Sequence, residues 1–70
     1  MTEAQRAALD TLHEQGWTYT ARTTSSGSIN KRAAESLIAL GYARWKDDAG
    51  WYVEITPKGR AAWKREIGTR

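Results

Sequence analysis

The segment from Tyr42 to Thr56, YARWKDDAGWYVEIT, constrains the fold more than any other part of the chain. Two runs of strand-favouring residues flank Asp48-Ala49-Gly50, which suits a three-residue loop built on a type I turn with Gly50 left-handed. A two-residue turn would shift the pairing by one residue and turn Trp45 outward. We predict the first register, which buries Trp45 and pairs opposite charges. The predicted cross-strand pairs are Ala43 with Ile55, Arg44 with Glu54 and Trp45 with Val53.

An amphipathic helix is predicted just before this hairpin, from Ser28 to Leu40. Its apolar residues recur with the 3.6-residue period of a helix that is buried on one side. We expect Ser28 to be the N-cap, with Ser25 and Ser26 as alternatives, and Gly41 to end the helix in the left-handed conformation. The buried stripe comprises Ile29, Ala33, Leu37 and Leu40, whereas Ile38 points away from it.

The opposite side of this helix is polar and basic. It carries Asn30, Lys31 and Glu35, with Arg32 at its border. These residues gather near the N-terminal half, where free N–H groups can bind phosphate. The competing interpretation is an ordinary solvated face, in which Lys31 and Glu35 form an i, i+4 ion pair.

The flanking segments predict two more helices and a short strand. Thr2 and Gln5 form a capping box for a helix over about residues 3 to 15, and strand-favouring residues run from Trp17 to Thr20. The next segment, ARTTSSGS, has no apolar periodicity, so we expect a loop with at most one helical turn near residues 20–24. This loop is either a flexible connector or a set of hydroxyl and N–H donors for a phosphate.

The last helix is expected to begin with Thr56 as N-cap and Pro57 at the first position. Gly59 would allow a close approach to a neighbouring element. Trp63 would pack on the first helix or anchor a dimer. His13, the single histidine of the chain, is expected at the surface or in an interface.

The composition excludes several classes of protein. Seventy residues predict one domain spanning residues 1–70. The absence of cysteine excludes disulfides and thiolate metal sites and fits a cytoplasmic protein. No signal peptide or membrane span is expected. The chain has one histidine and no carboxylate pair or glycine-rich phosphate loop in a recognisable frame, since Asp47-Asp48 sits in a turn where Asp is ordinary. We therefore expect neither an enzyme nor a metal or small-molecule cofactor.

The charge distribution favours a polyanionic partner. The net charge is +3. Acidic residues outnumber basic ones over residues 1–15, whereas basic residues predominate over 16–46 and 57–70. Such polarity suits a protein that turns one face to a nucleic acid.

The order of these elements resembles the winged helix-turn-helix family, and most closely its multiple-antibiotic-resistance-regulator (MarR) and PadR-like branches. The most telling strings are LIALGYAR, at residues 37–44, and VEITPKGRAAW, at residues 53–63. The resemblance implies an α+β fold with three helices, a short strand and a β-hairpin wing. Because ARTTSSGS is a poor candidate for a helix, the second helix of the motif is expected to be reduced.

The resemblance also implies binding of double-stranded DNA, in transcriptional regulation or as an accessory factor in recombination or replication, as in small phage-type regulators. The recognition helix would lie in the major groove, where Lys or Arg pairs with guanine and Asn with adenine. The acidic Asp47-Asp48 turn would repel phosphate, so the wing tip either stays clear of DNA or serves another partner. The candidate DNA-contacting residues are Ser26, Ser28, Asn30, Lys31, Arg32, Arg44 and Lys46, with Lys31 and Arg32 foremost.

A protein-interaction domain is the main alternative. Its anchors would be Ile38, Trp51, Tyr52 or Trp63, since aromatic residues are favoured at protein interfaces. A homodimer through the first and last helices is a further expectation. RNA binding ranks third, because the sequence shows no aromatic stacking platform of the usual kind.

Overall fold

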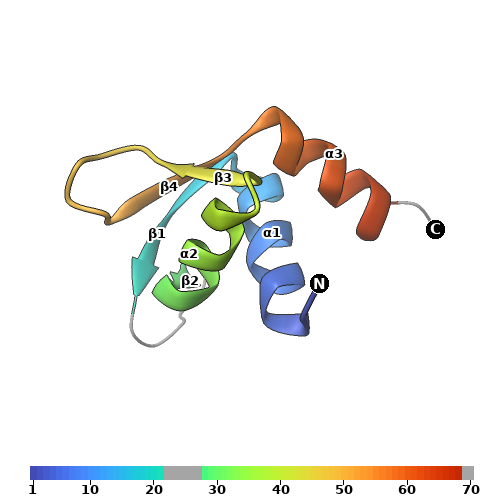
Figure 1. Ribbon diagram of the computed structural model, residues 1–70, viewed down its shortest axis with the longest axis horizontal. Coiled ribbons are helices and arrows are strands. Elements are labelled where there is room, and N and C mark those ends of the chain that lie inside the picture. The colour runs from blue at the N-terminus through green and yellow to red at the C-terminus, as the bar shows by residue number, and fades with distance from the viewer. Residues whose placement is uncertain (22–27, 69–70) are drawn as a thin grey trace.

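The computed structural model describes residues 1–21 and 28–68, which form three helices and a four-stranded mixed sheet. This is a small α+β fold. Figure 1 shows the β3–β4 hairpin and α3 at opposite ends of the molecule. No helix in the described ranges is long and apolar enough to cross a bilayer. The elements are α1 (Glu3–Gln15), β1 (Trp17–Ala21), β2 (Ile29–Asn30), α2 (Lys31–Ala39), β3 (Ala43–Trp45), β4 (Tyr52–Ile55) and α3 (Pro57–Glu66).

The sheet has the strand order β2-β1-β4-β3. β1 lies inside the sheet, where it pairs in parallel with β2 and antiparallel with β4. The sequence predicted β1 and the hairpin but not β2. This parallel strand departs from the expected arrangement of one short strand and a hairpin.

The hairpin has the predicted register in all three cross-strand pairs. Gly50 has a φ of +77°, as the predicted left-handed position requires. The Asp47 carboxylate holds the loop together, because its Oδ1 accepts hydrogen bonds from the backbone N–H groups of Trp51 and Tyr52 at 3.1 and 3.0 Å. Asp47 therefore has a structural role at the turn.

The predicted start of the basic helix is wrong. Ile29 and Asn30 form β2 beside Thr20 and Ala21, and α2 begins only at Lys31. The N-cap is Asn30 rather than Ser28. Pairing with the free edge of β1 satisfies backbone groups that the sequence pattern had assigned to a helix. The rival caps Ser25 and Ser26, and most of the ARTTSSGS connector, lie outside the described residues.

The end of α2 is as predicted, although its buried stripe differs. Gly41 has a φ of +82°, and the Gly41 and Tyr42 N–H groups donate to the carbonyls of Ile38 and Leu37, which is a Schellman motif. Leu40, predicted to be buried, is exposed because it is the C-cap residue, where the helical repeat stops. Ile38, predicted to point away from the core, is partly buried against it.

The core lies between the helices and one face of the sheet, called here the inner face. Strand residues alternate between the two faces, so every second side chain points inward. The fully buried inner-face residues are small or medium-sized: Thr18, Thr20, Ala43, Val53 and Ile55. Trp45, which pairs with Val53, lies on the same face and is partly buried against the core. The helices contribute Ala8, Leu9, Leu12, Ala33, Ala34, Leu37 and Ala62.

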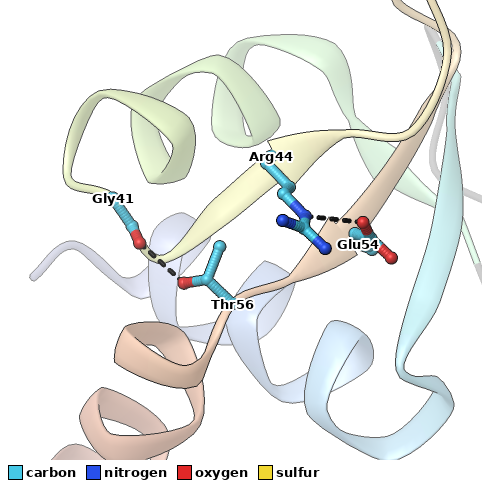
Figure 2. A network of polar contacts seen from close by, with 4 residues as sticks. All are labelled: Gly41, Arg44, Glu54 and Thr56. Carbon is cyan, nitrogen blue, oxygen red and sulfur yellow. Dashed lines mark hydrogen bonds and ion pairs between the residues drawn. The ribbon is translucent and has the colours of Figure 1, made fainter.

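The start of α3 is fixed to the segment that ends α2. The Thr56 hydroxyl caps α3 by accepting from Gly59 N–H, and it donates to the Gly41 carbonyl at 2.6 Å (Figure 2). A Cβ on Gly59 would lie 1.9 Å from the Tyr42 carbonyl oxygen. The close approach predicted for Gly59 is thus confirmed.

The first and last helices, α1 and α3, pack against each other as the sequence predicted. α1 begins with the Thr2–Gln5 capping box. Trp63 of α3 packs on α1, where its Nε1–H donates to Asp10 at 2.9 Å and its ring stacks on His13 with 3.5 Å between centroids. These contacts place His13 in the contact between α1 and α3.

Candidate nucleic-acid interface

The first turn of α2 carries the two foremost candidate DNA-contacting residues, Lys31 and Arg32. Lys31 and Arg32 are both exposed. Among the described residues, Lys31 does not form the ion pair with Glu35 that the solvated-face interpretation requires. The Asn30 side chain accepts from Arg32 N–H at 2.8 Å, so its oxygen is engaged in capping. Two unneutralised cations therefore stand at the start of the helix.

The base of the hairpin loop lies beside this turn. Lys31 and Trp51 line one hollow of about 300 Å³, together with Thr20 and Ala21 of β1. The position of Trp51 is fixed by its carbonyl, which accepts from Thr20 N–H at 2.9 Å. The fold thus brings the first turn of α2 and the hairpin to a common surface.

The structure does not bring all the predicted site residues together. Asn30, Lys31 and Arg32 are consecutive at the β2–α2 junction. Ser28 is only 6% exposed, so it is poorly placed to contact a ligand. Ser26 lies outside the described residues. Arg44 projects from the other face of the sheet, opposite the helices.

That other face, called here the outer face, carries six large side chains in two rows, with Ala21 beyond them toward β2. The first row runs across β1, β4 and β3, and the second ends at Lys46, the residue after β3. The pairing places Trp17, Glu54 and Arg44 in one row. The second row contains Tyr19 and Tyr52, followed by Lys46, whose N–H donates to the Tyr52 carbonyl at 2.7 Å.

The aromatic rings of the outer face are accessible. Trp17, Tyr19 and Tyr52 are 47%, 43% and 45% exposed. The Trp17 and Tyr52 rings are 5.9 Å apart and tilted by 57°, so they are not stacked face to face. The Lys46 ammonium lies 5.0 Å from the centre of the Trp17 ring, in a cation–π contact. The rings and the lysine form one continuous surface.

Two of the three acidic groups near this surface are engaged, whereas Asp48 in the turn is exposed. Arg44 Nε donates to Glu54 Oε1 at 2.6 Å across the two hairpin strands (Figure 2), as the predicted register requires. Asp47 accepts two backbone hydrogen bonds in the turn. Lys46 has no carboxylate partner among the described residues. The outer face thus contains two cations and one carboxylate.

This aromatic surface was not predicted from the sequence. Its signal was present in the alternation of Trp17-Thr18-Tyr19-Thr20, which places both rings on one face of a strand. Alternation alone does not show which face the helices cover. The packing of the helices on the opposite face leaves these rings exposed.

The proposed protein-interaction anchors differ in accessibility. Trp51 and Tyr52 are exposed, whereas Ile38 and Trp63 are partly buried against the core. The described residues contain no group of three or more histidine, aspartate or glutamate side chains that could hold a metal ion. Comparison of the chain with protein-family models, curated proteins and solved structures finds no significant match.

Proposed function

We propose that this protein is a winged-helix domain that binds double-stranded DNA, with α2 as the recognition helix and the β3–β4 hairpin as the wing. The observation that carries the proposal is the hollow shared by Lys31 and Trp51, because it joins the first turn of α2 to the hairpin. A winged helix needs these two elements side by side to contact one duplex. The biological role that fits is transcriptional regulation, or an accessory role in recombination or replication.

Lys31 and Arg32 would supply most of the binding free energy. Both are exposed, and Lys31 is not neutralised by Glu35. Cations at a helix N-terminus can reach both guanine edges and phosphates, and each phosphate contact releases counterions from DNA. Asn30 positions these residues by capping the helix. We therefore assign Asn30 a supporting role in place of a base contact.

Arg44 and Lys46 are expected to contribute less to duplex binding. Arg44 is paired with Glu54, and both cations lie on the outer face, away from the first turn of α2. The exposed Asp48 keeps the wing tip away from the minor groove, because its carboxylate would face phosphates there. The proposed duplex therefore contacts the base of the wing and not its tip.

Selection of bound sequences from random duplex DNA, followed by titration of the selected duplex, tests the proposal. The Lys31→Ala/Arg32→Ala variant should bind about 10-fold or more weakly, and its log–log salt slope should fall by about one unit per cation removed. The control is Arg60→Ala/Lys64→Ala on α3, which removes two exposed cations from another face. Equal losses in both variants, or no duplex binding by the unaltered protein, would refute the assignment.

The selected sequences also test the expected homodimer through α1 and α3. A dimer with two-fold symmetry binds two half-sites, so the selected motif would be palindromic. A single asymmetric half-site, together with a monomeric mass in light scattering, would limit the proposal to a monomer.

A further inference from the structure

We propose that the outer face of the sheet is a second binding site, which takes single-stranded DNA by stacking bases on Trp17, Tyr19 and Tyr52. This site is formed by other residues than the proposed duplex site and recognises a different state of the nucleic acid. The stacking argument is independent of the duplex proposal. Only the choice of DNA over RNA as the ligand rests on the duplex proposal.

The geometry of the three rings fits unpaired bases. Tyr19 and Tyr52 are directly opposite one another on the two inner strands, and Trp17 is the next outward residue on β1. Because the Trp17 and Tyr52 rings are tilted and not stacked on each other, they leave ring surface free for a base. Each base has a π-face that can stack on an aromatic side chain, whatever its identity. Bases in a duplex are paired and stacked internally, which restricts this mode to single strands.

The charges beside the rings fit a phosphate backbone. Lys46 stands at the β3 edge in the same row as Tyr52, and its ammonium lies over Trp17. Its flexible side chain can move from the ring to a phosphate. The only carboxylate among the six side chains, Glu54, is neutralised by Arg44. A strand whose bases lie on β1 and β4 would thus have a cation beside its backbone.

Charge distinguishes the possible occupants of this face, since aromatic rings are favoured at protein interfaces as well as in stacking on bases. A second copy docked through this face would bring two sets of cations together. Single-stranded DNA can stack its bases on the rings and place its phosphates beside Lys46.

The test uses the full chain and a labelled oligothymidylate of about 12 nucleotides, which is within the usual size of a single-strand site. The Tyr19→Thr/Tyr52→Thr variant keeps strand-favouring residues but removes both rings. It should bind at least about 10-fold more weakly, since each stacked base contributes roughly 5- to 100-fold to affinity. Tyr19→Phe/Tyr52→Phe keeps the rings and should bind like the unaltered protein. The circular dichroism spectrum of the threonine double variant should match that of the unaltered protein, which excludes loss of folding as the cause.

A crossed comparison separates this site from the duplex site. Lys31→Ala/Arg32→Ala should keep oligothymidylate binding within about 2-fold, because in the described residues neither cation contacts the three rings, whereas Lys46 does. Photocrosslinking of bromouracil-containing DNA should label Trp17, Tyr19 or Tyr52. Failure of the duplex proposal alone would leave both results unchanged.

Several outcomes would overturn the single-strand site. These are no oligothymidylate binding by the unaltered protein, equal binding by the threonine double variant, or crosslinks confined to α2. Preference for an oligouridylate of the same length would assign the face to RNA. A dimer that dissociates in the threonine double variant would assign it to a second copy of the chain.

Discussion

The two faces of the sheet differ in a way that burial of apolar surface does not explain. On the inner face, the buried side chains include Thr18 and Val53. On the outer face, the neighbouring residues Trp17 and Tyr52 are far larger, yet nearly half exposed. Burying the rings would remove more apolar area from water than burying a threonine. The fold therefore places three of the four aromatic side chains of its strands on the outer face, whereas the fourth, Trp45, packs against the core.

This difference teaches that stability and binding are separable in this sheet. Because strand residues alternate between faces, adjacent positions in β4 can be changed with opposite consequences. Substitutions on the inner side should unfold the protein without informing on binding. Substitutions on the outer side should change binding while the protein stays folded.

The largest loss of stability is expected from a substitution at Gly59, where α3 approaches the Tyr42 backbone most closely. In Gly59→Ala the added Cβ would meet the Tyr42 carbonyl at 1.9 Å, so α3 must move away from the segment that follows α2. Overpacking usually costs about 1–3 kcal/mol, and this backbone clash should exceed that range. Thermal unfolding followed by circular dichroism should show a mostly unfolded or strongly destabilised protein. The adjacent Arg60→Ala, at an exposed position, should unfold near the unaltered temperature.

A matched pair on β4 tests the contrast between the faces directly. Val53→Ala removes two methyl groups from a fully buried site and should lower the free energy of unfolding by about 2–3 kcal/mol. Tyr52→Thr, one residue away, should cost about 1 kcal/mol or less, because only contacts such as that with Trp17 are lost. Urea denaturation midpoints measure both. Equal costs would show that the outer rings support the fold as much as the core does.

The smallest effect is expected from the ion pair of the outer face. Arg44→Gln breaks an exposed pair with Glu54, and such pairs contribute about 0–1 kcal/mol. The stability change should shrink further when salt is added. The free energy of oligothymidylate binding should fall by more than the free energy of unfolding. The reason is that the variant leaves the Glu54 carboxylate without its cation, so it repels the phosphates of the bound strand. Unchanged binding would exclude Glu54 from the vicinity of the bound phosphates.

Local chemistry sufficed to predict much of the fold. Caps and turns depend on neighbouring residues, so Thr2 and Thr56 marked two helix starts and Gly41 marked a helix end. The hairpin register followed from Gly50 and from the opposite charges on its two strands. β2 could not be predicted in this way, because its two residues become a strand only when the edge of β1 lies beside them.

In the candidate site, too, some features follow from neighbouring residues and others only from the packing of distant elements. The sequence by itself determined that Lys31 and Arg32 are cations at a helix start and that Trp17 and Tyr19 share one face of a strand. Only the tertiary structure decided that Arg44 is separated from the α2 cations and that the aromatic face is the exposed one. The physical reason is that alternation and periodicity sort side chains onto faces, whereas the packing of distant elements decides which face meets water.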